Sequence, residues 1–395
     1  MRIIHVSRLC TSTMYDQIMK NDDVKISQSI QKFNRVMVEG LAINGVRTIV
    51  YSERPVNRKN CEKKYLAASE EEENNVYYHY SRIFNLPIIG IVYAILSSFC
   101  WLFIHMRKDD IVILDTYQLA IAIGTICASK LRRINCVGIV TDIPTKSTFY
   151  ADGKKVSNKS KFNDWLITKC DGMIFITEQM NEVVNPKNKP YIVVEGFADL
   201  SRTIISNKFE EKYKKWTVMY TGGVYQSYGL DMLLQAFIEA DLPDSQLIIY
   251  GGGPYVEEVK KYSDIYEKVV YGGVKNNNEI VCEQTRATLL VNPRYTNHEF
   301  TKYSFPGKNV EYMASGTPTL TTDLPGMPTE YKEHLFVLSE ETVSGMKTEL
   351  QSIYSISRLE LHRIGLEAQK WMIDNKSNKV QAKKIIDFIC QTYMR

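Results

Sequence analysis

The sequence predicts an α/β protein made of two doubly wound, Rossmann-like domains that face a cleft. In the first half, short apolar runs alternate with longer segments of helical spacing, which favours a parallel sheet covered by helices. The second half repeats this alternation, and three of its strand-like runs end in glycines, at 222–223, 251–253 and 272–273. The length of 395 residues suits two domains of roughly 150–200 residues each.

The individual elements follow from these runs. In the first half we expect strands at 2–6, 46–51, 111–114, 136–140, 173–176 and 191–194, with helical segments at 27–44, 83–106 and 117–132. In the second half we expect strands at 216–221, 246–250, 268–271 and 287–291, with helices at 229–240 and 255–263.

Polar stretches set the expected boundaries. The run 199–215 reads as a linker, which gives domains at 1–205 and 206–375 and a final helix at 376–395. The highly charged run 53–76 is expected to be an exposed excursion. The lysine-containing run 145–163 reads as a loop, either one that orders around a substrate or a plain surface loop.

Composition excludes several classes of protein. A hydrophobic content of 44% and a charged content of 24% are ordinary for a globular protein, and a net charge of +4 argues against a nucleic-acid binder. The eight cysteines include no Cys-x-x-Cys pair, which fits a reducing compartment. The six histidines show no metal-ligand spacing, and we expect no metal site. The first residues read as a buried strand, not as a signal peptide.

Residues 83–106 contain no Asp, Glu, Lys or Arg, and Arg82, Arg107 and Lys108 flank them. Three interpretations stay open: a membrane span, a buried core helix, and a helix with one face in the bilayer interface. A span would put strand 111–114 across the bilayer from strand 2–6. On the interface interpretation, acidic substitutions at Leu96 and Leu102 would release the protein from membranes.

The most informative stretch is 303–318, which combines a Pro-Gly turn, a short helix and a Ser-Gly stop before a strand. A helix start offers free N–H groups and a positive dipole end to an anion such as a diphosphate. Lys308 adds a positive charge there, and Glu311, one turn later, could accept hydrogen bonds from sugar hydroxyls. These features predict a site for a nucleotide sugar.

This stretch resembles the C-terminal donor-site motif of GT-B glycosyltransferases of the family 4 type, especially the bacterial capsule and exopolysaccharide branch. Gly307 stands where that motif has a serine. The matching residues are Ser304, Phe305, Pro306, Lys308, Glu311, Tyr312, Ala314, Ser315, Gly316 and Pro318.

The resemblance implies a donor domain at 206–375, an acceptor domain at 1–205 and a final helix that crosses back to the acceptor domain. It assigns catalytic roles to Lys308 and Glu311, and to Asp142 on the acceptor side. The expected donor-binding residues are Gly222, Gly223, Tyr225, Gly252, Gly253, Val274, Arg294, Tyr303, Ser304, Phe305, Pro306 and Asn309.

The chain departs from the family pattern at two places. Many relatives have an Arg and a Lys in the loop after residue 223, where this chain has Tyr225 or Gln226 and then Tyr228. Arg294 is therefore expected to join Lys308 on the diphosphate. Tyr303 stands where many relatives carry a first acid.

The acceptor groove is expected at strand ends of the first domain. Asp142 follows strand 136–140, Ser7 and Thr13 follow strand 2–6, and Asp115 follows strand 111–114. Asp142 could orient an acceptor hydroxyl, or it could be an ordinary cap or loop aspartate.

By this resemblance the chain is a retaining glycosyltransferase that needs no metal or other cofactor, and no Asp-x-Asp occurs in it. The expected donor is a UDP-sugar, with a GDP-sugar as second choice. The expected acceptor is a lipid-linked saccharide for cell-surface polysaccharide. The enzyme would be cytoplasmic and peripheral on the inner face of the membrane, touching it through 83–106, with no nucleic-acid partner. The alternatives are a nucleotide-sugar epimerase of the same fold and a non-catalytic donor-binding subunit.

Overall fold

The computed structural model describes residues 1–18, 28–56, 61, 63–147, 155–199 and 206–394. The chain divides into two compact units: unit 1 comprises Met1–Phe197 and Asn378–Arg395, and unit 2 comprises Ala198–Ser377. The sequence placed these divisions at 205/206 and 375/376. Parts of the predicted excursion (57–60 and 62), substrate loop (148–154), linker (200–205) and first helix (27) lie outside the described residues.

Unit 1 contains a largely parallel sheet in the order β10-β9-β8-β7-β1-β2-β5-β4, in which only β4 runs antiparallel to its neighbour. The direction of strand order reverses at β1, between β7 and β2. The strands are β1 (Arg2–Ser7), β2 (Arg47–Ser52), β4 (Ser69–Glu73), β5 (Val76–Tyr80), β7 (Asp110–Asp115), β8 (Cys136–Val140), β9 (Gly172–Phe175) and β10 (Tyr191–Val193).

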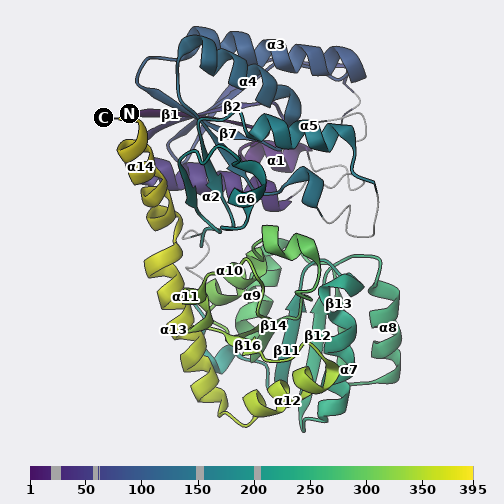
Figure 1. Cartoon of the computed structure of the whole chain (residues 1–395). Coiled ribbons are helices and arrows are strands. Elements are labelled where there is room, and N and C mark those ends of the chain that lie inside the picture. Colours follow the sequence, from purple (N-terminus) through teal and green to yellow (C-terminus); the bar gives the residue numbers. More distant parts are fainter. Residues whose placement is uncertain (19–27, 57–60, 62, 148–154, 200–205, 395) are drawn as a thin grey trace. The chain divides into compact units, whose positions relative to one another are not determined.

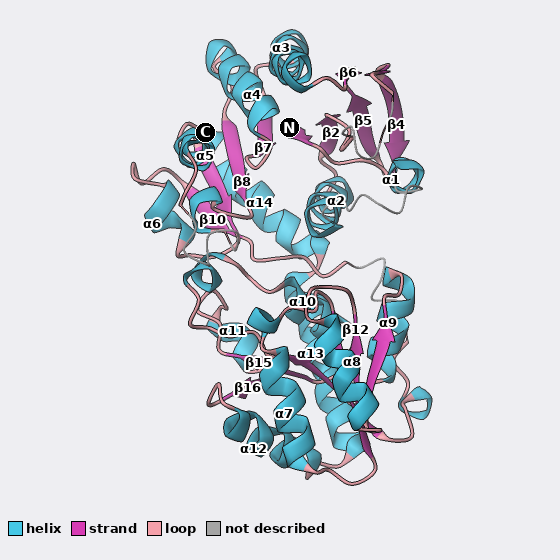
Figure 2. Ribbon diagram, turned by 90° about the vertical axis from the view of Figure 1, so that its right-hand side faces the viewer, coloured by secondary structure: helices cyan, strands magenta, loops and turns pink. Residues whose placement is uncertain are grey.

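Helices cover both faces of this sheet because its strands are apolar on both sides. Ile3 and Ile111 point into a core formed with α2 (Gln28–Ile43) and α14 (Asn378–Tyr393). Their neighbours Ile4 and Val112 point into a second core with α3 (Pro87–His105) and α4 (Leu119–Arg132). The alternation of one residue is the period of a strand. Figures 1 and 2 show α3 beside α4 on the outside of unit 1.

Glycines allow two close helix contacts in unit 1. A Cβ at Gly40 of α2 would lie 2.4 Å from the carbonyl oxygen of Asn378, so α2 and α14 touch through backbone. A Cβ at Gly124 of α4 would lie 2.2 Å from Oγ of Ser98, so α3 and α4 are equally close. The first contact fixes the C-terminal helix on unit 1.

Unit 2 contains a six-stranded parallel sheet in the order β13-β12-β11-β14-β15-β16, the doubly wound order 3-2-1-4-5-6. The order reverses between β11 and β14, and ligands of such sheets bind beyond the carboxyl ends at this point. The strands are β11 (Trp216–Thr221), β12 (Ser245–Tyr250), β13 (Val269–Gly273), β14 (Leu289–Asn292), β15 (Thr319–Thr322) and β16 (Phe336–Leu338).

The two faces of this sheet carry different helices. Val218 and Tyr220 of β11 pack with α7 (Leu230–Ala240), α8 (Val256–Ile265) and α12 (Val343–Tyr354). Met219 packs on the other face with Tyr312 of α10 (Gly307–Ala314). The C-terminal end of α10 is held by α13 (Arg358–Lys376), where a Cβ at Gly365 would lie 2.3 Å from the carbonyl oxygen of Gly316.

The structure corrects several expectations in unit 1. The charged excursion 53–76 contains β3 (Tyr65–Leu66) and β4, whose glutamates pair in register with β5. The loop 145–163 contains a 3₁₀ turn, η1 (Pro144–Lys146), and the start of α5 (Asn158–Ile167). Segment 83–106 begins with β6 (Ile83–Phe84), which pairs with β3, so α3 starts only at Pro87. Strand β5, within the sheet, was missed.

The remaining described elements are helices and 3₁₀ turns outside the sheets. They are α1 (Ser12–Ile18), α6 (Met180–Val184), η3 (Phe209–Glu211), η4 (Gln226–Tyr228), α9 (Asn277–Arg286), η5 (Glu299–Tyr303) and α11 (Thr329–Lys332).

Candidate functional site

The central feature of unit 2 is the path of the Lys308 side chain. Lys308 lies in the first turn of α10, and its Nζ donates a hydrogen bond to the hydroxyl of Tyr220, which belongs to the opposite face of the sheet. It reaches that face by passing Gly222, directly after β11. A Cβ at Gly222 would lie 2.3 Å from Cε of Lys308, and Gly222 has φ +136°. Glycine is therefore required at this turn both for the lysine path and for the backbone.

A second glycine holds the neighbouring turn against this one. A Cβ at Gly251, after β12, would lie 1.8 Å from the carbonyl oxygen of Gly222. The N–H of Gly222 donates to the carbonyl of Tyr250 (2.9 Å), and that of Val224 donates to the carbonyl of Gly252 (2.9 Å). The loops after β11 and β12 thus form one backbone-bonded layer at the carboxyl edge of the sheet.

Tyr312 fixes α10 to the same edge. Its buried hydroxyl accepts a hydrogen bond from the N–H of Thr221 (2.9 Å) and donates one to the carbonyl of Thr221 (3.0 Å). Because Tyr312 lies one turn after Lys308, this pair of bonds sets the distance between the start of α10 and the end of β11. Gly307 begins the helix, and apart from its chain neighbours and its own helix backbone, no described residue has an atom within 4 Å of the place that its Cβ would occupy. The described part of the chain therefore leaves the helix start open.

Two cations and three aromatic rings alternate at this edge. Nζ of Lys308 lies 4.0 Å from the ring centre of Tyr220 and 5.3 Å from that of Tyr228. Cζ of Arg294, which follows β14, lies 5.3 Å from the ring of Tyr228 and 4.7 Å from that of Phe300. We call these five residues the cation–aromatic ladder. Each such contact stabilises a cation by about 0.5–2 kcal/mol, depending on its exposure.

The ladder changes the chemistry of Lys308. Burial lowers the pKa of its ammonium group to about 7, the nearby Arg294 guanidinium lowers it too, and the Glu311 carboxylate opposes these effects. A lysine in this state is protonated in only part of the molecules at neutral pH. An anion placed beside it would raise its pKa, since opposite charge favours the charged form.

Eight of the predicted site residues fall into two groups. Gly222, Gly223, Tyr225, Arg294 and Lys308 lie at or next to the ladder, and the Tyr225 and Tyr228 ring centres are 5.1 Å apart. Gly252 and Gly253 lie against the backbone of Val224 or the side chain of Val274. Val274 is 74% exposed, as an apolar contact for a base would have to be.

The remaining motif residues have different environments. Glu311, Tyr303 and Ser304 are half-buried. Phe305 is buried and packs on Tyr331, with ring centres 5.1 Å apart, and Pro306 is buried as the N-cap of α10.

Asn309 differs from its predicted role. It is fully buried, its Oδ1 accepts a hydrogen bond from Asn292 (2.8 Å), and its Nδ2 donates to Thr321 (3.2 Å). Its N–H already donates to the carbonyl of Pro306 (2.9 Å). Asn309 therefore ties α10 to β14 and β15 through hydrogen bonds in the core. Phe305 also packs in the core, so both residues hold the motif in position and do not face a ligand.

Sequence reasoning missed Tyr220, Tyr228, Phe300 and the anchoring role of Tyr312. Tyr228 carried a signal, because it stands where the family pattern has a cation. Tyr220 carried none, since a tyrosine in a buried strand is an ordinary core residue.

In unit 1, three predicted acceptor-side residues lie at the carboxyl ends of β1, β7 and β8, which are neighbours in the sheet: Ser7 ends β1, Asp115 ends β7, and Asp142 comes shortly after β8. Ser7 is buried, and its Oγ accepts the N–H of Leu9 (3.0 Å), so it shapes the turn after β1. Asp115 is 3% exposed, and its Oδ1 accepts the N–H of Tyr117 (3.1 Å). Asp142 is half-buried, and Thr13, in α1, is exposed.

Burial raises the pKa of Asp115 to about 6; the N–H of Tyr117 and the charge of Arg8 lower it, and the Asp142 carboxylate raises it. The Asp142 carboxylate thus acts on the buried Asp115 carboxyl group at the edge where these strands end. A buried carboxyl with a raised pKa at such an edge is a mark of a functional site, because burial of the charge alone destabilises the fold.

Residues 215–355 match the family model described as "Glycosyl transferases group 1". No curated protein sequence matches the chain.

Solved structures resemble the whole chain at low identity. A sucrose-phosphate synthase from Thermosynechococcus elongatus is 12% identical with a TM-score of 0.66, covering 100% of both chains. HepE from Anabaena, in complex with UDP, is 13% identical with a TM-score of 0.64, covering 99% of this chain and 100% of the other. A lipopolysaccharide outer core galactosyltransferase, in its apo form, is 14% identical with a TM-score of 0.62, covering 99% of each.

These likenesses confirm the predicted GT-B fold, with two Rossmann-like domains. The family match over most of unit 2 confirms the predicted enzyme class, a glycosyltransferase.

The ladder predicts proton uptake on donor binding. At pH 8, where Lys308 is largely neutral, a diphosphate should bind with uptake of up to one proton, because its charge raises the pKa of the lysine. Between pH 7 and 9 the affinity for UDP should fall, by up to about tenfold per pH unit. Calorimetry in buffers of different ionisation enthalpy measures the uptake. Lys308→Met should abolish it, and a wild-type protein that takes up no proton would refute the assignment.

Tyr228 should act through its ring. Tyr228→Leu removes the aromatic face between two cations, and we expect a roughly 5- to 10-fold weaker affinity for UDP, from about 1 kcal/mol of lost cation–π stabilisation. Tyr228→Phe keeps the face and should bind as the wild type does. Equal affinities of all three proteins would show that the ladder does not hold the cations in place.

The ionised carboxylate of Asp115 should lower the free energy of unfolding of the protein. Its folded-state pKa of about 6 lies above the usual value, so the ionised carboxylate destabilises the native state above pH 6, and this penalty vanishes toward pH 4. Asp115→Asn should raise the unfolding temperature at pH 8, from about 2 kcal/mol of added stability, and the gain should shrink as the pH falls. The exposed Asp109→Asn is the control, and a pH-independent gain for Asp115→Asn would contradict the assignment.

Proposed function

We propose that this enzyme transfers a sugar from a nucleoside-diphosphate sugar, with UDP favoured and GDP as second choice, to a lipid-linked saccharide. The observation that carries the donor half is the pair of cations, Lys308 and Arg294, held at the point where the strand order of unit 2 reverses. The exposed start of α10 adds the positive end of the helix dipole to the same edge. This is a site for two phosphate groups.

The proposed reaction needs no metal. Lys308 and Arg294 would take the negative charge that develops on the leaving diphosphate, which is the electrostatic task a metal performs elsewhere. Glu311, one turn along α10 from Lys308, would bind hydroxyl groups of the donor. Retention of the anomeric configuration follows the family resemblance, with the departing diphosphate deprotonating the incoming hydroxyl.

UDP is favoured because similar folds bind it. HepE and a TarM variant from S. aureus were solved with UDP, and the trehalose-phosphate synthase of Burkholderia xenovorans is described as UDP-forming. The exposed Val274, beside the Gly252 turn, is the proposed apolar contact for the base.

The acceptor is proposed from unit 1, where Asp142 and Asp115 would orient the incoming hydroxyl. The lipopolysaccharide galactosyltransferase supports a role in bacterial cell-surface polysaccharide, such as capsule or exopolysaccharide. Sucrose-phosphate and trehalose-phosphate synthases share the fold, so a soluble sugar phosphate is the second candidate acceptor. For the lipid-linked acceptor, we place the enzyme in the cytoplasm, on the inner face of the membrane.

Two measurements test the proposal. Thermal shift and calorimetry against UDP, GDP, ADP, TDP and CMP, with and without magnesium, should show stabilisation by UDP without metal. If no nucleotide stabilises the protein, the non-catalytic subunit is favoured. If UDP binds only with magnesium, the metal-free reaction is refuted. Transfer from labelled UDP-sugars to a membrane lipid extract or to glucose 6-phosphate then separates the two acceptors.

Lys308→Ala and Glu311→Ala should each lower turnover by about 100-fold, the usual cost of losing one group that stabilises the transition state. Lys302→Ala, an exposed lysine just before the motif, is the matched control. Unfolding temperatures check that each variant is folded. Wild-type turnover in both variants would show that neither Lys308 nor Glu311 takes part in the reaction.

A further inference from the structure

Helix α3 leaves most of its surface uncovered. Ala94, Ser98 and Leu102, each four residues apart, are its buried residues and form the stripe that meets α4. The other side is apolar and exposed, with Ile88 at 77%, Leu96 at 55% and Ile104 at 70% exposure. The full exposed apolar face is Ile88, Ile89, Ile91, Val92, Leu96, Phe103 and Ile104. A contiguous face of this kind marks an interaction surface.

Cations collect at the C-terminal end of this face. Arg107 and Lys108 follow α3, and Arg132 and Arg133 end α4; all four are exposed. The ends of the two helices lie together, since Arg132 donates to the carbonyl of Met106 (2.8 Å) and its Cζ lies 5.4 Å from the ring centre of Phe103.

Acidic groups balance only part of this charge. Asp110 pairs with Arg2, Asp171 lies 3.8 Å from Lys130, and Asp109 is exposed. The end of α3 therefore carries an excess of positive charge directly beside apolar side chains.

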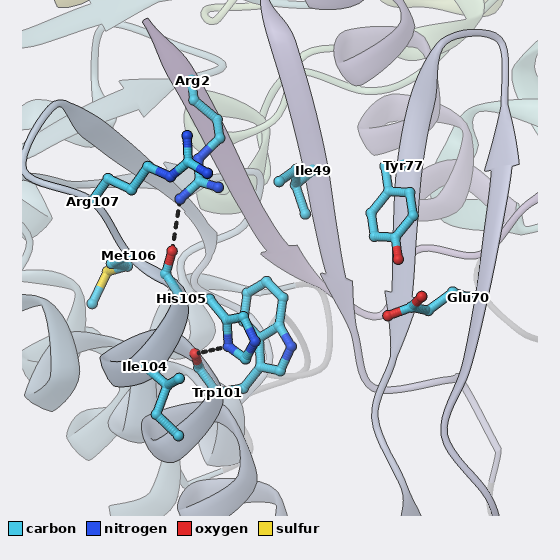
Figure 3. Close-up of a pocket in the computed structure, with 9 residues that line it drawn as sticks. All are labelled: Arg2, Ile49, Glu70, Tyr77, Trp101, Ile104, His105, Met106 and Arg107. Carbon is cyan, nitrogen blue, oxygen red and sulfur yellow. Dashed lines mark hydrogen bonds between the residues drawn. The ribbon is translucent and has the colours of Figure 1, made fainter.

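A cavity of about 410 Å³ opens at the same end, between α3 and the strands β1, β2, β4 and β5 (Figure 3). Trp101, Tyr77 and Arg107 line it beside the exposed Ile104. The Trp101 ring stacks on His105, with ring centres 4.6 Å apart, and on His79 at 4.9 Å. Glu70, the acidic residue of the lining, is engaged by His79 (3.1 Å). Aromatic rings and cations beside an apolar face are typical of the headgroup layer of a membrane.

Helix α3 is long and apolar enough to cross a membrane by length and composition. Its connections favour a helix that lies in the interface. Strand β6, just before it, pairs with β3, and β7, just after it, pairs with β1, so both ends enter unit 1. A crossing would also separate Ser98 from Gly124, where the helices are closest.

We infer that the exposed face of α3 lies in the surface of an anionic bilayer, with the Trp101 cavity and the four cations at the headgroup layer. The apolar side chains stabilise binding because they are buried in the bilayer interface, and the cations make the binding selective for anionic lipid. This inference deepens the proposed function, because it names the face by which the enzyme reaches a lipid-linked acceptor.

Leu102, chosen from the sequence as lipid-facing, is fully buried against α4, so its replacement by Asp would damage the fold. The structure instead points to Ile89 and Leu96, at 57% and 55% exposure. The matched control is the pair Ile265→Asp and Leu359→Asp, two exposed apolar residues of unit 2.

The test is sedimentation of the full chain with vesicles of phosphatidylcholine alone or with added phosphatidylglycerol. The wild type and the control pair should bind the vesicles that contain phosphatidylglycerol. Ile89→Asp with Leu96→Asp should bind at least about tenfold more weakly, the loss that corresponds to one buried leucine. Arg107→Gln with Lys108→Gln should lose about fivefold per cation, on anionic vesicles only.

Equal binding of the wild type and the Ile89/Leu96 variant would overturn the inference. Equal binding to both kinds of vesicle would overturn the role of the cations. A wild-type dimer that these substitutions dissociate, without vesicle binding, would assign the face to a second copy of the chain. Alkaline extraction should release the vesicle-bound protein, and resistance to it would indicate a span.

Each variant should still bind UDP with wild-type affinity, because α3 belongs to unit 1. Loss of vesicle binding with UDP binding intact therefore tests α3 alone. If the wild-type protein does not bind UDP, the proposed function is refuted, and the result on membrane binding still holds.

Discussion

The proposed donor site depends on the absence of a side chain at one residue, Gly222. Gly222 leaves open the space through which Lys308 passes from α10 to Tyr220, and Gly251 lets the next loop close on the Gly222 carbonyl. Any Cβ at either place would overlap atoms already there. The two hydrogen bonds of Tyr312 then hold the helix at the distance this path requires. The placement of the Lys308 ammonium group relative to the helix start follows from these contacts.

Most of unit 2 could be predicted from its sequence because its signals are local. Apolar runs that end in glycines define β11 and β12, and the Pro-Gly and Ser-Gly pairs bound α10. The ladder could not be predicted, because Tyr220, Tyr228 and Phe300 meet the cations only through the fold. Asn309 shows the same limit: a polar residue inside a ligand motif was expected to bind the ligand, whereas it joins three elements from the core.

Unit 1 was harder to predict for a related reason. Strand β5, Val76–Tyr80, follows a run of charged residues, and its tyrosines and histidine give little apolar signal until the sheet buries them. The apolar segment 83–106 gave a strong signal that fitted three different environments. The buried stripe of Ala94, Ser98 and Leu102, with Ser98 against Gly124 of α4, shows which side of the helix is covered.

The run of four glutamates in β4 has a consequence for solubility. Strand β4 is the last strand at its edge of the sheet, and Glu70 and Glu72 are exposed there. An uncovered edge is a template on which another chain can add a strand, and a row of like charges repels a second copy of itself. Glu71 accepts a hydrogen bond from Thr11 (2.6 Å), and Glu73 accepts one from the N–H of Ser12 (3.1 Å), so the same strand also holds the start of α1. The glutamates of β4 thus disfavour strand addition at this edge, and two of them also stabilise the fold through α1.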